Sequence, residues 1–241
     1  MTYILVTGSS RGIGAAAQKL LSERGVNVIG HGTRPGDPSC IAADFTNPLA
    51  AQLLWEEALD RSGGAISAVV NNAGLFSPNA IDSSDIEWLD GWEDTLRINL
   101  TAAAQLSRFA VRHWNNHAPG SDGVRGRLVH VASRAAYRGD SPAHWHYAAA
   151  KGGMVAMHKT IARAYASQGI VSFAITPGFT DTSMADDYLD SRGGAGLLAD
   201  IPLGRVATPE EIARIIAFCA LDAPASMTGA VIDANGASYV R

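Results

Sequence analysis

The stretch Thr7-Gly-Ser-Ser-Arg-Gly-Ile-Gly14 decides the fold of this chain, because it joins an apolar run at Tyr3–Thr7 to a helical stretch at Ile13–Arg24. Its glycines allow a tight turn and a close approach to a pyrophosphate, and the start of the helix supplies free N–H groups. Glycines also occur in ordinary turns. Here the order of strand, glycine loop and helix favours a dinucleotide-binding site.

Apolar runs of strand length recur along the whole chain, and most are near-continuous, as expected of parallel strands covered on both faces. They are Tyr3–Thr7, Val26–Gly30, Cys40–Ala43, Ala65–Asn71, Leu128–Ala132, Val171–Thr176 and Ala230–Asp233. The helical stretches between them are Ile13–Arg24, Leu49–Arg61, Trp92–Asn115, Tyr147–Gln168 and Pro209–Leu221. This alternation predicts an α/β fold: a Rossmann-type, doubly wound parallel sheet of seven strands with helices on both faces.

The length of 241 residues suits one domain, and we expect residues 1–241 to form it without a linker or a repeat. The connection from Gly30 to Cys40 is too short and too rich in proline and glycine for a helix, so we expect a loop there. Gly193-Gly194 marks the segment expected to be most mobile, a substrate loop near residues 183–200.

Charge and composition exclude several classes of protein. The net charge of −4 and the sequence pI near 5.9 argue against a nucleic-acid binder. Cys40 and Cys219 are far apart and lack CxxC spacing, which indicates a reduced, cytoplasmic protein. The first strand begins at Tyr3, which leaves no room for a signal peptide, and no apolar run approaches the ~20 residues that span a bilayer.

A second motif, Tyr147-Ala-Ala-Ala-Lys151, places a phenol and an ammonium on one face of a helix. A fixed positive charge beside a phenol can lower the pKa of the phenol towards neutrality. Ser133 and Asn71-Asn-Ala-Gly74 each end an apolar strand, and Asn99 lies in the helical stretch between them. Parallel strands expose such residues to a crevice at their carboxyl ends. A dinucleotide site combined with a tuned proton donor indicates hydride transfer.

The preferred cofactor depends on the end of the second strand. Sites that prefer NAD usually present an acidic residue there to hold the ribose hydroxyls, and Gly30-His-Gly-Thr-Arg34 contains none. Arg11 and Arg34 could instead flank a 2′-phosphate, although Arg34 could also be a solvated loop residue. We therefore expect NADP(H) to be favoured over NAD(H).

Together these motifs resemble the short-chain dehydrogenase/reductase family, from Tyr3 to about Ser238. The matching motifs are TGSSRGIG, Asp44 after the third strand, NNAG, Asn99, Ser133, YAAAK, Pro177-Gly178 and Thr228-Gly229 with Asn235-Gly236. The segments Ile201–Arg205 and Thr208–Ile212 additionally resemble bacterial 3-oxoacyl-carrier-protein reductases and their many relatives.

The resemblance implies a role for each catalytic position. Tyr147 would be the general acid in carbonyl reduction and the base in alcohol oxidation, and Ser133 would polarise the substrate oxygen. Lys151 would lower the pKa of Tyr147, hold the nicotinamide ribose and join a water relay held by Asn99. With the residues argued above, the expected cofactor contacts are Gly8, Ser10, Arg11, Gly12, Ile13, Gly14, Arg34, Asp44, Asn72, Ala73, Gly74, Tyr147, Lys151, Pro177, Gly178, Thr180 and Thr182.

Two features depart from the family pattern. Ser133 and Tyr147 are one residue further apart than is common, which can reshape the substrate pocket. The short link after Arg34 replaces the usual helix, so the 2′-phosphate region is harder to predict. His144 and His146, which precede Tyr147, either line the substrate pocket or lie on the helix surface.

No metal site is expected. His113 and His117 have the spacing of a metal-binding pair, but no carboxylate or thiol motif accompanies them. A pair favoured by the dipole at a helix C-terminus is the better interpretation.

The sequence therefore predicts an enzyme, a short-chain NAD(P)-dependent oxidoreductase that interconverts a ketone and a secondary alcohol. A 3-oxoacyl thioester is the first substrate class to test. The alternatives are an NAD-dependent alcohol dehydrogenase acting oxidatively and a nucleotide-binding regulator without catalytic activity. The resemblance also implies a homotetramer or homodimer, with the helices at Trp92–Asn115 and Tyr147–Gln168 at one interface.

Overall fold

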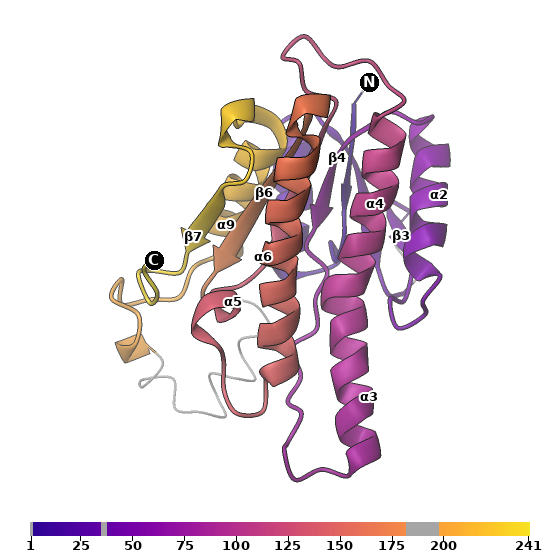
Figure 1. Cartoon of the computed structure of the whole chain (residues 1–241). Helices are drawn as coiled ribbons and strands as arrows, with labels where there is room; N and C mark the ends of the chain where they lie inside the picture. The colour runs from indigo at the N-terminus through magenta and orange to yellow at the C-terminus, as the bar shows by residue number, and fades with distance from the viewer. Residues whose placement is uncertain (1, 35–37, 182–197) are drawn as a thin grey trace.

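Seven parallel strands form one sheet in the order β3-β2-β1-β4-β5-β6-β7 (Figure 1). The strands are β1 (Tyr3–Val6), β2 (Asn27–Gly32), β3 (Cys40–Ala42), β4 (Ile66–Asn71), β5 (Gly126–Val131), β6 (Ile170–Pro177) and β7 (Val231–Ala234). The computed structural model describes residues 2–34, 38–181 and 198–241. Each strand falls within a residue or two of its predicted apolar run, and the predicted doubly wound sheet is confirmed.

The strand order reverses between β1 and β4, and this reversal positions the site. Val6 pairs with Gly30 of β2 on one side and with Val70 of β4 on the other. The connections that leave β1 and β4 therefore run in opposite directions across the sheet, which opens a crevice at the carboxyl ends of the strands.

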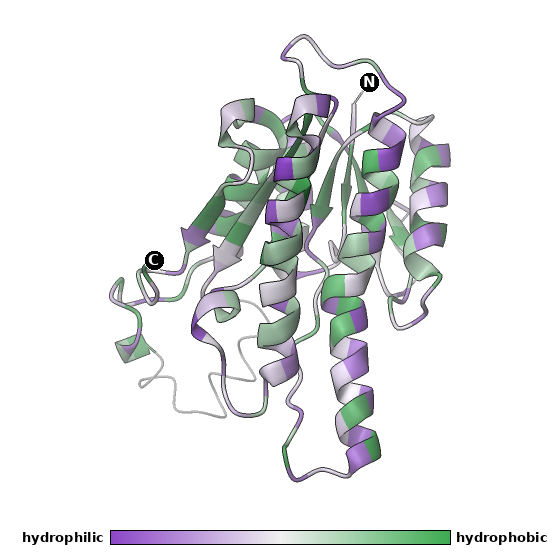
Figure 2. Ribbon diagram, viewed as in Figure 1, coloured by the Kyte–Doolittle hydropathy of each residue, from purple (hydrophilic) through white to green (hydrophobic). Residues whose placement is uncertain are grey.

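Helices cover both faces of the sheet. The α-helices described over their full length are α1 (Gly12–Glu23), α2 (Ala50–Ser62), α3 (Asp85–Leu96), α4 (Ala102–Trp114), α5 (Ala135–Arg138), α6 (Trp145–Tyr165) and α9 (Pro209–Ala217). Helices α1 and α9 pack together over a core that includes Val6, Phe173 and Ile212, whereas α2 and α4 cover a second core around Leu54 and Leu128. Figure 2 shows predominantly hydrophobic strands and hydrophilic residues along the helices that cover them. The sheet is thus buried on both sides, as its near-continuous apolar runs require.

The predicted helix at Trp92–Asn115 is longer than expected, and it is interrupted. It begins at Asp85, because Ser84 and Glu87 form a capping box in which each side chain bonds to the backbone N–H of the other residue. A π-helical turn, η1 (Arg97–Thr101), joins α3 to α4. The capping box was readable in the sequence, but the π-turn leaves no comparable pattern.

Helix α9 begins at Pro209, the first residue of its predicted helical stretch, and Thr208 and Glu211 form a capping box there. No helix occurs among the described residues between β2 and β3, which agrees with the expected loop. The expected substrate loop near 183–200 lies, except for its last three positions, outside the described residues. Within the described part of the chain, no helix combines the length and apolarity needed to cross a bilayer.

Candidate active site

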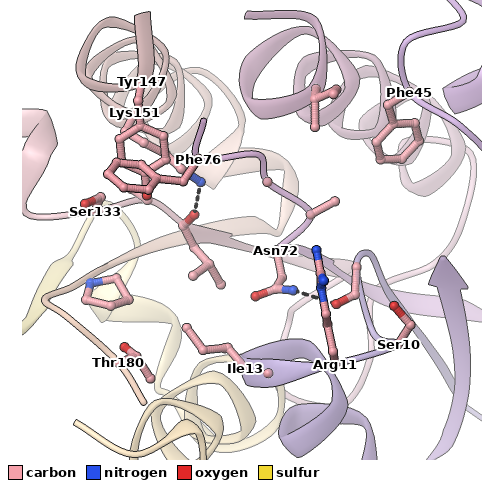
Figure 3. A pocket seen from close by; sticks show the side chains of 18 of the residues that line it. Ser10, Arg11, Ile13, Phe45, Asn72, Phe76, Ser133, Tyr147, Lys151 and Thr180 are labelled. Atoms are coloured by element: carbon pink, nitrogen blue, oxygen red, sulfur yellow. Dashed lines mark hydrogen bonds between the residues drawn. The ribbon is translucent and has the colours of Figure 1, made fainter. Parts of the chain in front are cut away.

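A cavity of about 560 Å³ lies at the carboxyl ends of the strands and brings together nearly all of the predicted site residues. Those on its wall are Gly8, Ser10, Arg11, Gly12, Ile13, Arg34, Asp44, Asn72, Ala73, Gly74, Ser133, Tyr147, Lys151, Pro177, Gly178 and Thr180. Figure 3 shows Tyr147, Lys151 and Ser133 gathered at one end, with Ser10, Arg11 and Ile13 at the other. The cavity thus has a phenol–ammonium end and a glycine-loop end.

Two of the predicted residues that the structure describes are not on the cavity wall. Gly14 lies beneath the glycine loop, where a Cβ would stand 2.1 Å from the carbonyl oxygen of Gly8. Asn99 is fully buried behind Gly74. Thr182 lies outside the described residues.

The glycine loop has the backbone geometry that its sequence predicts. Gly8 and Gly12 have φ angles of 65° and 56°, in the left-handed region that side chains disfavour. Arg11 occupies the N-cap position of α1 without a side-chain cap, and the first turn of α1 holds no acidic residue. The unpaired N–H groups at the start of a helix attract anions. This donor set fits the pyrophosphate of a dinucleotide.

Two side chains that directly follow β1 and β4 join the glycine loop to the chain after β4. The Asn72 side chain donates to the carbonyl oxygens of Thr7 at 2.9 Å and Gly8 at 3.1 Å. The Thr7 hydroxyl accepts from the backbone N–H groups of Asn72 at 2.9 Å and Ala73 at 3.0 Å. The nitrogen of the Asn72 amide is therefore committed to holding the glycine loop.

His31 also lines the cavity, and the sequence analysis did not identify it as a site residue. Its Nδ1 accepts from the backbone N–H of Gly8 at 3.0 Å, and its Nε2 lies 2.8 Å from the carbonyl oxygen of Ala43. The ring stacks on Phe45, with centroids 4.3 Å apart. The segment Gly30–Arg34 had been considered only for its lack of an acidic residue. The signal in the sequence that could have identified His31 was a histidine near the end of β2, just before a glycine-rich connection.

Lys151 is buried on α6, one helical turn after Tyr147. Its ammonium donates to the carbonyl oxygen of Val131 at 2.8 Å and lies 5.7 Å from the centre of the Tyr147 ring. Burial lowers the pKa of Lys151 to about 8. The bond to the end of β5 holds the ammonium at the cavity, where Tyr147 and Ser133 also lie.

The pKa of Tyr147 departs from its ordinary value in the direction opposite to the one expected. Burial of the phenol raises it to about 12, while a hydrogen bond with Ser133 lowers it and the charge of Asp140 raises it further. The Lys151 ammonium is directed to a carbonyl oxygen rather than to the phenol. Poor solvation of the phenolate therefore sets the direction of the pKa shift in this geometry.

The side chain of Asn99 is fully used within the protein. Its amide oxygen accepts from the N–H of Leu75 at 3.1 Å, and its amide nitrogen donates to the carbonyl oxygens of Leu75 at 2.9 Å and Thr95 at 3.0 Å. These bonds anchor the chain after β4 to the π-turn. Asn99 thus positions Gly74 and its neighbours, and its side chain does not reach the cavity.

Aromatic and charged residues that the sequence did not single out complete the phenol–ammonium end. Phe76 packs edge-on against Tyr147, with centroids 4.8 Å apart, and Phe179 carries the guanidinium of Arg134 above its ring at 4.6 Å. Phe76, Phe179, Arg134 and Asp140 all line the cavity. Three of them lie within two residues of NNAG, Ser133 or Pro177-Gly178, but none of the four belongs to a motif itself.

Neither interpretation of the two histidines before Tyr147 holds. His144 and His146 are both buried, so they are not surface residues, and neither is on the cavity wall. The His144 ring stacks on Phe76 at 3.9 Å and accordingly supports the wall from behind. At the other end of the molecule, His113 and His117 bond to the backbone carbonyl oxygens of Gly64 and His113.

The chain matches both a known protein family and individual relatives. Residues 8–236 match the family model described as enoyl-(acyl carrier protein) reductase. The chain is 34% identical to the 3-oxoacyl-(acyl-carrier-protein) reductase FabG of Vibrio cholerae over 247 residues, which covers 98% of this chain and 96% of that one. It is 32% identical to the FabG reductase of Escherichia coli, with the same coverage.

Solved structures give the same fold. A putative NAD(P)-dependent gluconate 5-dehydrogenase from Beutenbergia cavernae, with bound NADP, aligns with a TM-score of 0.85 and 27% identity over 98% of this chain and 95% of that one. The aldohexose dehydrogenase of Thermoplasma acidophilum aligns with a TM-score of 0.86 over 100% of this chain and 94% of that one. At 23% identity, the second match supports the fold alone.

Proposed function

Because the chain belongs to the short-chain dehydrogenase/reductase family, we propose that it is an NADP(H)-preferring oxidoreductase that interconverts a ketone and a secondary alcohol. The observation that carries the proposal is one cavity with an uncapped helix start at one end and Tyr147, Lys151 and Ser133 at the other. A dinucleotide held at the glycine loop would extend towards this second end. We further propose that Tyr147, Ser133, Lys151 and Asn99 are the residues on which catalysis depends.

The nicotinamide cofactor would supply or accept a hydride at the carbonyl carbon. The chain's part is to handle the proton and the charge on the oxygen. A tyrosine whose pKa lies near 12 keeps its proton at neutral pH, so Tyr147 is in the state needed to donate it to the oxygen of a ketone under reduction. Ser133, hydrogen-bonded to the same phenol, would orient that oxygen and stabilise its developing negative charge.

Lys151 and Asn99 would support this proton transfer by Tyr147. The Lys151 ammonium lies at the cavity wall, where it would hold the nicotinamide ribose and favour loss of the Tyr147 proton through its charge. Asn99 keeps the chain after β4 in place through its bonds to Leu75. The water relay expected of Asn99 would have to involve its backbone, since its amide group is already bonded.

The preference for NADP(H) rests on charge at the glycine-loop end. Arg11 and Arg34 line the cavity there, and β2 ends at Gly32 without a carboxylate. Asp44 is the acidic residue on this part of the wall, and its carboxylate accepts two bonds from Thr46. Two guanidinium groups suit a 2′-phosphate, which they can bind through paired hydrogen bonds. The relative with bound NADP is consistent with this preference.

A 3-oxoacyl thioester is the first substrate to test, because the curated relatives named above are 3-oxoacyl-(acyl-carrier-protein) reductases. Purified protein would be titrated with NADPH and NADH by nicotinamide fluorescence and then assayed with the thioester and with cyclic and aromatic ketones. Tighter binding of NADPH and its consumption by a ketone are expected. Tighter binding of NADH would redirect the search to alcohol oxidation, and failure to bind either nucleotide would refute the proposal.

A further inference from the structure

We propose that His31 is a positioning residue that holds the glycine loop in its cofactor-binding shape only while its imidazole is neutral, so that cofactor affinity falls on acidification. The inference rests on the proposed function, because it takes the glycine loop as the site of the dinucleotide. His31 lies at the end of β2 and is 2% exposed.

The two bonds of the His31 ring require one neutral tautomer. The backbone N–H of Gly8 can only donate, so Nδ1 must accept at their separation of 3.0 Å. The carbonyl oxygen of Ala43 can only accept, so Nε2 must carry the proton at their separation of 2.8 Å. An imidazolium carries a proton on both nitrogens and therefore cannot accept from Gly8. Protonation replaces a hydrogen bond with two donors that face each other.

His31 connects three strand ends that form the glycine-loop end of the cavity. Its backbone N–H donates to the Ser9 hydroxyl at 3.0 Å, and its carbonyl oxygen accepts from the Ser9 N–H at 2.8 Å. Its ring reaches across to Ala43 and Phe45 after β3. A ring displaced from Gly8 would therefore disturb the loop on which the cofactor pyrophosphate would lie.

Burial leaves the neutral form of the His31 ring favoured. Burial lowers the pKa of His31 more than the Ala43 bond and the charge of Asp44 raise it. Arg11 in the β1–α1 loop and Arg34 after β2 line the same cavity. Their positive charges disfavour a further positive charge on the His31 ring. Cys40 of β3 contacts the Ser9 hydroxyl at 3.6 Å. The ring therefore titrates below its ordinary range near pH 6.5.

His31 is not placed as a direct ligand of a cofactor phosphate, because both of its nitrogens bond to backbone groups. The two kinds of histidine predict opposite dependences of cofactor affinity on pH. A histidine that bound the phosphate would strengthen binding when it gained a proton. A histidine that must accept from Gly8 weakens binding on the same change, by up to about tenfold for each pH unit below its pKa, as expected for one coupled proton.

The test compares the NADPH dissociation constant of the wild-type protein and of His31→Asn between pH about 8 and about 5. The side-chain amide oxygen introduced by that substitution can accept from Gly8, and the amide cannot titrate. The cofactor phosphate titrates in the same range, so the informative quantity is the difference between the two proteins. We expect the wild-type affinity to fall relative to the variant. His113→Asn removes a partly buried histidine at the far edge and should follow the wild-type profile.

Parallel profiles for wild type and His31→Asn, or a wild-type affinity that rises on acidification, would overturn the inference. A second measurement does not depend on the cofactor or on the variant. In protein labelled with isotopic glycine, the Gly8 amide resonance should shift with the titration of the His31 ring. A Gly8 resonance that stays constant through that titration would refute the inference. Absence of NADPH binding at every pH would instead refute the proposed function.

Discussion

At the scale of single residues, the phenol oxygen of Tyr147 is the atom on which the proposed chemistry depends. Replacing Tyr147 with phenylalanine removes the proton donor and leaves the ring packed against Phe76. We expect turnover to fall by about 10²–10⁴-fold, the usual contribution of a positioned acid, while NADPH affinity stays nearly unchanged. Steady-state kinetics and a fluorescence titration of the same preparation measure both. Turnover equal to that of the wild type would show that another group supplies the proton.

Gly32 is the residue at which the nucleotide preference can be changed. A Cβ placed there meets the Ser10 side chain at 3.5 Å and 3.7 Å, which is ordinary contact, so a larger residue fits. Gly32→Asp adds a carboxylate at the end of β2, which repels a 2′-phosphate and accepts from ribose hydroxyls. We expect NADPH affinity to fall about tenfold or more, equivalent to about 1.4 kcal/mol, and NADH affinity to rise.

Gly32→Ala is the matched control for that substitution, because it fills the same space without charge. Its ratio of NADPH to NADH dissociation constants should resemble that of the wild type. If Gly32→Ala changed the ratio as much as Gly32→Asp, the effect would be steric. Arg11 and Arg34 would then lose their proposed role in recognising the phosphate.

At the scale of elements, the start of α1 depends on a close approach between two backbone segments. A Cβ at Gly14 would lie 2.1 Å from the Gly8 carbonyl oxygen and 2.6 Å from the Asn72 amide. Gly14→Ala should therefore lower the free energy of unfolding by about 1–3 kcal/mol, measured by chemical denaturation. Gly152→Ala in α6 is the control, since its Cβ would have only ordinary contact, at 3.7 Å. Alanine is the better helix former, so the control should be neutral or stabilising.

The elements differ in how far their sequences predict them. Apolar runs located all seven strands, and the helical stretch predicted from Pro209 begins where α9 begins, because burial and capping act over a few neighbouring residues. The glycine loop and the Tyr147–Lys151 pair were predictable for the same reason. His31 was not, because its partners Gly8 and Ala43 come from two other strand ends. Phe76 and Phe179 likewise reach one cavity wall only when the chain is folded.

The predicted direction of the Tyr147 pKa shift was wrong for a related reason. The four-residue spacing correctly placed Lys151 one turn away, but it contained no information on the burial of the phenol or on the bond from Lys151 to Val131. Both depend on packing against β5. Residue spacing within a helix predicts which groups are neighbours, whereas their pKa values depend on what the remaining elements exclude.

At the scale of the whole molecule, buried neutral histidines make stability depend on pH. His130 of β5 is fully buried beside Asn71, and burial together with the charges of His158 and Lys151 lowers its pKa to about 3. The unfolded chain binds a proton there near pH 6.5 and the folded chain does not until about pH 3. Stability contributed by neutral His130 is therefore present above pH 6.5 and is lost as pH falls.

His130→Gln tests this linkage. Each pH unit below 6.5 should cost the wild-type protein up to about 1.4 kcal/mol through this residue, and the variant should lose less. Denaturant unfolding at several pH values and one protein concentration gives the two slopes. Equal slopes would assign the acid sensitivity to other groups, among which His31 and His158 also have lowered pKa values.

Assembly is the other prediction at this scale. Helices α4 and α6 lie side by side on one face of the sheet (Figure 1), and Ile86 and Leu89 of α3 are exposed. The family resemblance implies that the helices of this face form an interface in a homotetramer. For a chain of 25.2 kDa, light scattering should then give about 100 kDa. A mass near one chain would contradict the expectation, and a mass near two would support the homodimer.

The π-turn between α3 and α4 limits where the chain can lose a residue. Deleting one residue from Arg97–Thr101 would restore regular α-helical bonding, because a π-turn holds one residue more than an α-turn. The same deletion would rotate α3 about 100° relative to α4 and withdraw Asn99 from Leu75. A shorter variant would therefore gain helical regularity and lose the support of the cavity. In related sequences, deletions should therefore be tolerated in the loop before Ser84 and should be absent from this turn.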